Sequence, residues 1–213
     1  MVRKSWISLL LVTVVLTAGC KHWEDEFSES LAGEKAAGEE RKKMESMPKK
    51  VKLETSKGDI IIELNEEKAP VTVANFLRYV EEGFYDGTIF HRVIPDFMVQ
   101  GGGFTADMQR EETHGMIVNE AQNGLKNNRG SIAMARMNDP DSASAQFFIN
   151  HKDNDNLNYA GQINPGYAVF GRVVEGMGVV DAIAAAKTTI RNGMGDVPIE
   201  PIVVESAKVV SGK

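Results

Sequence analysis

The sequence is short of cysteine and of positive charge, and both shortages restrict what the protein can be. Cys20 is the only cysteine among 213 residues, so no disulfide can form within the chain and stability must come from a buried core. Lys and Arg together number 24 against 30 Asp and Glu, which gives a formal net charge of −6. A phosphate-binding face usually appears as a basic excess, so the composition argues against a nucleic-acid partner.

Sequence motifs for three common chemistries are also absent. The glycines of QGGGFT, at residues 100–105, are not followed by Lys-Ser/Thr, and no G-x-G-x-x-G opens a helix after a strand. No G-x-S-x-G motif supports a serine hydrolase. We therefore expect neither a metal nor a cofactor, and we interpret His91, beside Arg92, as a hydrogen-bonded structural residue rather than a base. None of the four histidines has metal-ligand spacing: His22, His91, His114 and His151.

Residues 1–19 have the composition of an export signal. Arg3 and Lys4 precede the apolar run WISLLLVTVVLTA, which is too short and too interrupted by hydroxyl residues for a spanning helix. The segment LTAGC resembles a bacterial lipobox, with Thr17 in the position three residues before Cys20 where Leu is usual. The resemblance implies that Cys20 is acylated, with palmitate, and anchors the mature protein to a membrane without spanning it. The alternative is a soluble secreted protein with a free thiol.

Residues 20–50 are rich in Glu, Lys and Ala and predict a charged tether. Trp23, Phe27 and Leu31 recur at a spacing of four, which places them on one face if the segment is helical. Pro48 ends such a helix. We interpret the segment as a solvated spacer between membrane and domain, with a partner-binding helix as the alternative.

Residues 51–213 form the predicted domain. VKLET and DIIIEL flank a turn at residues 56–58 and predict a hairpin, and APVTVANFLRYVEEG predicts a helix that opens at Pro70 and ends at Gly83. Short strand-like runs follow, then a second helix in EGMGVVDAIAAAK and a final strand in IVVESAKVV. Many short strands with only two helices favour an all-β barrel or sandwich over a βαβ sheet.

The most informative segment is FHRVIPDFMVQGGGFT, at residues 90–105, because Arg92 interrupts a run otherwise suited to burial. On a strand, Arg92 shares a face with Phe90 and Ile94, and the same alternation pairs Met98 with Gln100. In QFFIN, Gln146 likewise shares a face with Phe148. Side by side, these runs predict an apolar surface that carries one cation and two amides. Because a guanidinium stays protonated at neutral pH, such a surface suits a reaction that needs neither nucleophile nor base.

Four segments together resemble the cyclophilin-type peptidyl-prolyl isomerases, particularly bacterial ones: FHRVIPDFMVQGGGFT, NGLKNNRGSIAMAR, DSASAQFFIN and YAVFGRVVEGM. The resemblance runs from about residue 51 to residue 210, with the motifs in the family's order. It implies a closed antiparallel eight-stranded barrel capped by two helices. It also implies that the protein accelerates rotation about the bond that precedes proline.

The resemblance assigns roles residue by residue. Arg92 matches the catalytic arginine, and Gln100 acts with it. Asn156 departs from the family pattern, because relatives usually carry an aromatic residue there that helps to hold the inhibitor cyclosporin. The departure puts tight cyclosporin binding in doubt. The implied substrate-binding residues are Phe90, Phe97, Met98, Ala135, Gln146, Phe148, Leu157 and Tyr167.

The sequence therefore predicts a peptidyl-prolyl isomerase that assists the folding of exported, proline-containing polypeptides. We expect a monomer anchored through Cys20, without nucleic-acid partners. Because Lys21 rather than Asp follows Cys20, we expect the periplasmic side of the outer membrane in a host with two membranes. In a host with one membrane we expect the outer face of the plasma membrane. The alternative is a proline-motif binding module or holdase with little turnover.

Overall fold

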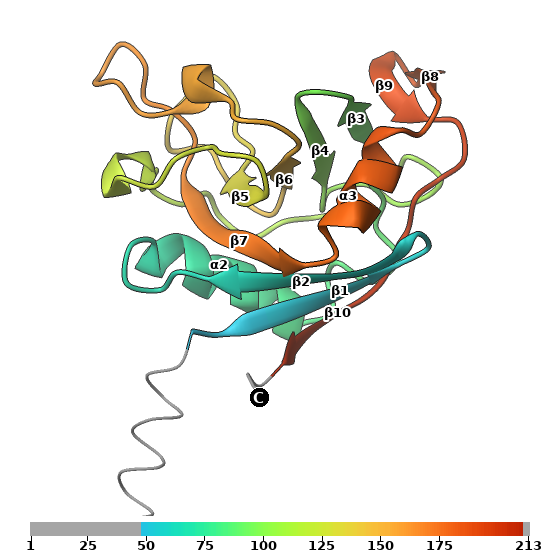
Figure 1. Ribbon diagram of the computed structural model, residues 1–213, viewed down its shortest axis with the longest axis horizontal. Coiled ribbons are helices and arrows are strands. Elements are labelled where there is room, and N and C mark those ends of the chain that lie inside the picture. The colour runs from blue at the N-terminus through green and yellow to red at the C-terminus, as the bar shows by residue number, and fades with distance from the viewer. Residues whose placement is uncertain (1–47, 211–213) are drawn as a thin grey trace, which may run out of the picture. The chain divides into compact units, whose positions relative to one another are not determined.

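The computed structural model describes residues 48–210, which form one curled antiparallel sheet with two helices and a small hairpin (Figure 1). The predictions for the signal segment, Cys20 and most of the tether lie outside the described residues. Eight strands make the sheet: β1 (Lys50–Thr55), β2 (Gly58–Leu64), β3 (Arg92–Ile94), β4 (Met98–Gly101), β5 (Ser131–Met134), β6 (Phe147–Asn150), β7 (Val169–Glu175) and β10 (Val204–Val210).

The sheet is not closed, which corrects the prediction of a closed barrel. Its strand order is β10-β1-β2-β7-β5-β6-β4-β3, so within residues 48–210 β10 and β3 are its two edges. Only isolated contacts join the segments just before these strands, such as Phe90 N–H donating to the Ile202 carbonyl at 2.9 Å. These contacts lie at residues 87–90, before β3 begins, and β3 itself does not pair with β10. The result is a curled, incompletely closed barrel.

Alternation along the strands gives the sheet two apolar faces with different neighbours. In β6, Phe147 and Ile149 belong to the main core inside the curl, whereas Phe148 belongs to a second cluster outside it. In β4, Val99 points inward, whereas Met98 joins the outer cluster. Side chains in a strand point alternately to opposite faces, so a wholly buried strand such as β6 supplies both clusters.

The two helices pack against the main core. Helix α2 (Pro70–Glu81) opens with proline at its first position and buries Phe76, whose ring lies 5.1 Å from that of Phe170 and 5.7 Å from that of Phe147. Gly83 has φ of +69° just beyond its end, as the sequence predicts for a residue that stops a helix. Helix α3 (Met177–Ala184) buries Val180. Within residues 48–210, no helix is long and apolar enough to cross a membrane.

The sequence patterns do not predict the hairpin of β8 (Thr188–Arg191) and β9 (Met194–Pro198), which lies outside the main sheet. Its turn is Asn192-Gly193, with φ of +51° and +78°, the backbone that this residue pair adopts readily. Two single-turn 3-10 helices, η1 (Ala121–Asn123) and η2 (Asp155–Leu157), complete the described elements. The hairpin matters because β9 lies beside the outer face of β3.

Candidate active site

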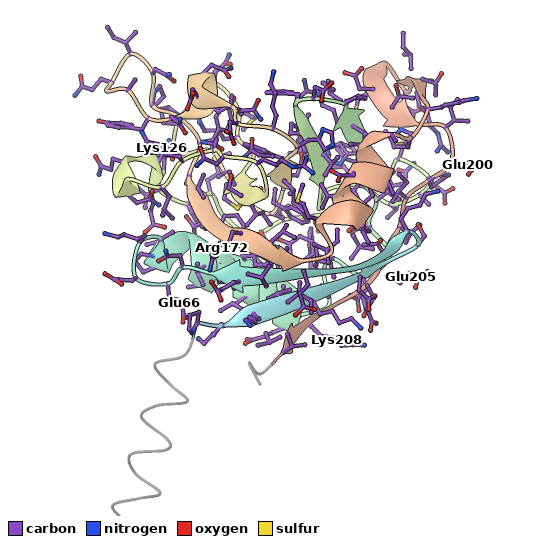
Figure 2. All side chains as sticks on the ribbon, viewed as in Figure 1. Glu66, Lys126, Arg172, Glu200, Glu205 and Lys208 are labelled. Carbon is purple, nitrogen blue, oxygen red and sulfur yellow. The ribbon has the colours of Figure 1, made fainter. Side chains whose placement is uncertain are left out.

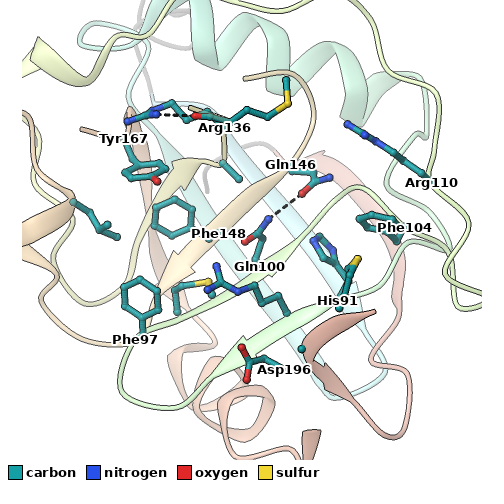
Figure 3. A pocket seen from close by; sticks show the side chains of 17 residues that line it. His91, Phe97, Gln100, Phe104, Arg110, Arg136, Gln146, Phe148, Tyr167 and Asp196 are labelled. Carbon is teal, nitrogen blue, oxygen red and sulfur yellow. Dashed lines mark hydrogen bonds between the residues drawn. The ribbon is translucent and has the colours of Figure 1, made fainter. Parts of the chain in front are cut away.

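A groove of about 530 Å³ lies on the outer face of the sheet, over β3, β4 and β6 (Figure 3). Nine of the ten residues that the family resemblance implies for the site line it, from Arg92 to Tyr167. The prediction that widely separated motifs meet on one wall is therefore confirmed in geometry. The lining residues are His91, Arg92, Phe97, Met98, Gln100, Phe104, Arg110, Ala135, Arg136, Met137, Gln146, Phe148, Leu157, Tyr167, Met194, Gly195 and Asp196.

One end of the groove is apolar. The rings of Phe148 and Tyr167 meet edge to face at 5.6 Å, and Phe97 lies nearby on the same side of the groove (Figure 3). Met98 and Leu157 pack in the same outer cluster. An apolar recess bounded by rings suits a small nonpolar ring such as that of proline, because burying apolar surface is favourable.

Buried asparagines behind this apolar end fix the backbone of its walls. Asn154 Nδ2 donates to the Phe97 carbonyl at 2.8 Å, and Asn127 Nδ2 donates to the carbonyls of Leu157 at 3.1 Å and Tyr167 at 3.4 Å. Each bond ties one wall of the recess to the same amide cluster. Because buried amides are costly unless they are hydrogen-bonded, this cluster favours a single arrangement of the three walls.

Arg92 stands on the outer face beside the apolar end. It opens β3 and lies directly opposite Gln100 in the β3–β4 ladder. Among the residues that the structure describes, Arg92 has no ion-pair or side-chain hydrogen-bond partner, so its donors are available to a ligand. A guanidinium that stays charged and presents donors in a fixed plane suits this position.

Two glutamines form the centre of the groove. Gln100 Nε2 donates to Gln146 Oε1 at 2.9 Å, shown by the dashed line in Figure 3. The bond orients both amides, and within residues 48–210 it leaves Gln100 Oε1 as an acceptor and a Gln146 N–H as a donor that can bind a peptide backbone. Gly103 explains part of the glycine run, since a Cβ there would lie 2.5 Å from Gln146 Nε2. A side chain at residue 103 would therefore displace Gln146 from the groove.

The structure corrects the prediction that Phe90 shares a face with Arg92. Phe90 precedes β3, is fully buried, and packs in the main core with its ring 6.3 Å from that of Phe147. The alternation of a strand does not extend back through His91 to Phe90, because regular pairing starts at Arg92. Phe90 supports the sheet from inside rather than lining the groove.

His91 is a neutral part of the groove wall. It is 2% exposed, and its ring lies 4.7 Å from that of Phe104. Burial, with the adjacent Arg92 charge acting in the same direction, lowers the pKa of His91 to about 4. The ring is therefore uncharged at neutral pH, which agrees with a structural role. Its Nδ1 has no hydrogen-bond partner among the described residues, so the prediction of a hydrogen-bonded histidine is not met at that atom.

Several groove residues are missing from the sequence-based prediction. Arg136 is the second residue after β5, and Arg110 lies in the loop after the glycine run. The β8–β9 hairpin adds Asp196, whose φ is +60°. The Asn192-Gly193 pair could have indicated this hairpin. No local signal indicates that Arg110 reaches the groove, because the path of its loop depends on distant contacts. One of these is the bond from His114 N–H to the Tyr79 hydroxyl at 2.8 Å.

Asn156 lies in η2, is exposed, and does not line the groove, whereas the next residue, Leu157, does. The rim therefore lacks a side chain that reaches inward from this position. Within residues 48–210, no group of three or more His, Cys, Asp or Glu side chains is arranged to hold a metal ion.

The fold and the groove together define a class of protein whose site suits the binding of a peptide and a reaction in which no covalent bond to the protein forms. Among the residues that the structure describes, the lining contains no serine, cysteine or lysine, its histidine is neutral, and its one carboxylate is Asp196 of the β8–β9 hairpin. What it offers is an apolar recess, backbone-binding amides and unpaired guanidinium donors. These groups can bind a peptide and stabilise a distorted amide, but they supply no nucleophile.

The chain belongs to the cyclophilin-type peptidyl-prolyl cis-trans isomerase family, whose model matches residues 50–209. It is 60% identical over 162 residues to peptidyl-prolyl cis-trans isomerase cyp18 of Streptomyces antibioticus, covering 75% of this chain and 98% of the relative. It is 54% identical over 162 residues to peptidyl-prolyl cis-trans isomerase B of Escherichia coli, with the same coverage. The crystal structure of a cyclophilin-type isomerase from Cryptosporidium parvum matches with a TM-score of 0.64 and 25% identity. That match covers 78% of this chain and 99% of the other.

Proposed function

We propose that this protein accelerates cis–trans isomerisation of X-Pro bonds in exported polypeptides while anchored to a membrane through acylated Cys20. The observation that carries the enzymatic part is the position of Arg92, whose unpaired guanidinium stands beside an apolar recess that fits proline. Membership of the isomerase family supports the same reaction. A related protein from Cryptosporidium parvum was crystallised in the presence of the dipeptide Ala-Pro, which supports a proline-containing substrate.

The mechanism follows from the chemistry of the peptide bond. Resonance opposes rotation about the C–N bond with a barrier of about 18–20 kcal/mol, so uncatalysed X-Pro isomerisation takes tens of seconds. As the bond twists, the proline nitrogen loses conjugation and becomes a better hydrogen-bond acceptor. Arg92 can donate to that nitrogen in the twisted state more favourably than in either planar state. Binding the twisted state in preference to the ground states is catalysis.

The neighbouring groups assist by holding the substrate on both sides of the rotating bond. The recess formed by Phe97, Met98, Phe148 and Leu157 holds the proline ring, while Gln100 and Gln146 bind the peptide backbone. The apolar surroundings strengthen the Arg92 hydrogen bond, because an electrostatic interaction weakens less in a site that excludes water. No cofactor takes part in these steps.

The experiment that tests this proposal is a peptide isomerisation assay on the whole chain. We expect clear acceleration by the wild-type protein and a poor rate for Arg92→Lys, because an ammonium lacks the planar arrangement of donors. Absence of acceleration by the wild-type protein would overturn the enzymatic proposal. If the protein still bound proline peptides, that result would favour the alternative, a binding module or holdase with little turnover.

The anchoring part of the proposal rests on residues 1–21 alone. The apolar segment before LTAGC and the lone Cys20 support lipid attachment, and Lys21 supports the outer membrane in a two-membrane host. We expect Cys20→Ser to release a soluble secreted form that still catalyses isomerisation. Continued membrane fractionation of that variant would overturn the proposal of a lipid anchor. The domain would act as a monomer at the end of its tether.

A further inference from the structure

A second, smaller pocket of about 110 Å³ opens from the groove, and we call it the side pocket. It shares Gln100 and Gln146 with the groove, and in Figure 3 these glutamines lie between the ring side chains and Arg110. A peptide whose proline fills the apolar end can therefore place a nearby side chain in the side pocket. The lining of the side pocket is Gln100, Arg110, Ala135, Arg136, Met137, Ser142, Ser144 and Gln146.

Two arginines line the side pocket, and their guanidinium groups are held differently. Arg136 is fixed in place, since its Nε donates to the Gly166 carbonyl at 3.0 Å and its Nη1 donates to the Met137 carbonyl at 2.8 Å. Its guanidinium also lies 4.5 Å from the centre of the Tyr167 ring. Arg110 is exposed, and among residues 48–210 it has neither an ion pair nor a side-chain hydrogen bond. The Arg136 guanidinium is thus hydrogen-bonded to the pocket wall, whereas the Arg110 guanidinium can bind a ligand.

The remaining polar groups of the side pocket match an acidic ligand. No carboxylate lines the side pocket, although the chain as a whole has a net charge of −6. Ser142 fixes the rim, because its Oγ accepts from Met137 N–H at 2.8 Å and donates to the Asp139 carbonyl at 2.5 Å. The Ser144 hydroxyl adds a further potential donor. Guanidinium, amide and hydroxyl donors without a neighbouring carboxylate favour a carboxylate ligand over a neutral or basic one.

We propose that the side pocket binds an acidic side chain of the substrate, located within two residues of proline, and that Arg110 selects it. Because the side pocket shares Gln100 and Gln146 with the groove, the side chain that enters it must lie close to the bond that rotates, and two residues of extended chain span at most about 7 Å. The inference rests on the proposed isomerase function, since it names the substrate class for the same groove. Acidic proline-containing segments are then the preferred substrates.

The test compares peptides that differ only by Glu or Gln at each of the two positions before and after proline. For the wild-type whole chain, we expect kcat/KM to be about five-fold higher for Glu than for Gln at one of these positions. The ratio should fall to about one in Arg110→Gln. It should also fall in the wild-type protein as salt is raised, because an exposed charge pair is screened.

Arg172→Gln provides the matched control, because it removes the same charge outside the groove. Arg172 lies on β7, paired with Glu63 of β2, and Figure 2 labels it there. We expect this variant to keep the wild-type preference for Glu. If Arg172→Gln lost the preference as Arg110→Gln does, the effect would come from overall charge rather than from the side pocket, and the proposal would be wrong.

Two other results also overturn the proposal and keep it distinct from the isomerase function. If the wild-type protein accelerates Glu and Gln peptides equally at all four positions, the isomerase function stands and the acidic preference is wrong. If it accelerates none of them, the isomerase proposal fails. Calorimetric binding of the same peptides then tests the acidic preference separately. Equal affinity for Glu and Gln peptides would show that this preference is wrong as well.

Discussion

Phe147 and Phe148 are neighbours in β6, yet they belong to different apolar clusters with different purposes. Phe147 packs in the core inside the curled sheet, where its ring meets those of Phe76, Tyr85 and Phe90. Phe148 packs on the outer face against Tyr167 and lines the groove. One strand therefore contributes to both stability and the candidate active site, and strand alternation separates the two contributions by a single residue. Substitutions at adjacent residues should have different consequences.

The largest effect that we expect is on the inner face. Phe147→Ala should lower the free energy of unfolding by about 3–5 kcal/mol, because it removes a fully buried ring and leaves a cavity. Phe148 is also buried, at 4% exposed, but its ring lines the groove, so Phe148→Ala leaves a space open to the groove rather than an enclosed cavity. It should therefore lower the free energy of unfolding less and should raise KM for proline peptides. Urea denaturation and the isomerisation assay, applied to both variants, measure the two effects. Equal loss of stability in the two variants would contradict the claim that the inner face stabilises the fold more than the outer face does.

The second effect concerns His91, which contacts the groove but is buried like a core residue. Its pKa is about 4 in the folded protein, below the ordinary value of 6.5, so the unfolded chain binds the proton more readily between these values. The stability contributed by the neutral ring is complete above about pH 6.5 and is lost as the pH falls toward 4. The wild-type protein should lose about 2 kcal/mol more than His91→Gln between about pH 7.5 and pH 5.

Denaturation curves for the two proteins at several pH values measure this difference. The two proteins differ only at residue 91, so the difference between their pH profiles reports His91. Identical pH dependence in the two proteins would contradict the assignment of His91 as a buried neutral ring.

A smaller effect is expected at Gly103, where the outer face depends on the absence of a side chain. In Gly103→Ala the new methyl group would push Gln146 aside and break its bond with Gln100. We expect kcat/KM to fall about ten-fold, equivalent to about 1.4 kcal/mol, with little change in stability. Gly115→Ala is the control, since a Cβ there meets no atom within 4 Å. Similar activity in both variants would show that the Gln100–Gln146 bond does not matter.

Much of the site could be predicted from the sequence because it depends on local patterns. Alternation predicts which side chains share a face within each of β3, β4 and β6, and Arg92, Gln100 and Phe148 come together because these strands pair side by side. The resemblance to a known family supplies their neighbours. The same reasoning fails at Phe90, because this residue lies before Arg92, where the regular pairing of β3 begins. Pattern alone does not reveal where regular pairing begins, because that depends on a partner strand distant in sequence.

The features that could not be predicted depend on long-range geometry. Whether the sheet closes is decided by the pairing of its two edge strands, which are separated by more than a hundred residues of chain. Arg110 reaches the groove because bonds such as that from Ile117 N–H to the Ala143 carbonyl, at 2.9 Å, fix the loop that follows it. Val197 and Pro198 are the only buried residues of β8 and β9, so these strands lack the apolar alternation by which strands are usually predicted.

The most direct test of the separation between the two faces is Arg92→Ala, measured for both activity and stability. We expect kcat/KM for a proline peptide to fall about 10²–10³-fold, as it does when a hydrogen-bond donor to the transition state is removed. The free energy of unfolding should stay within about 0.5 kcal/mol of the wild-type value, because Arg92 is exposed and unpaired within the described part of the chain. Retained activity, or a loss of activity matched by a loss of stability, would contradict the assignment of catalysis to the outer face.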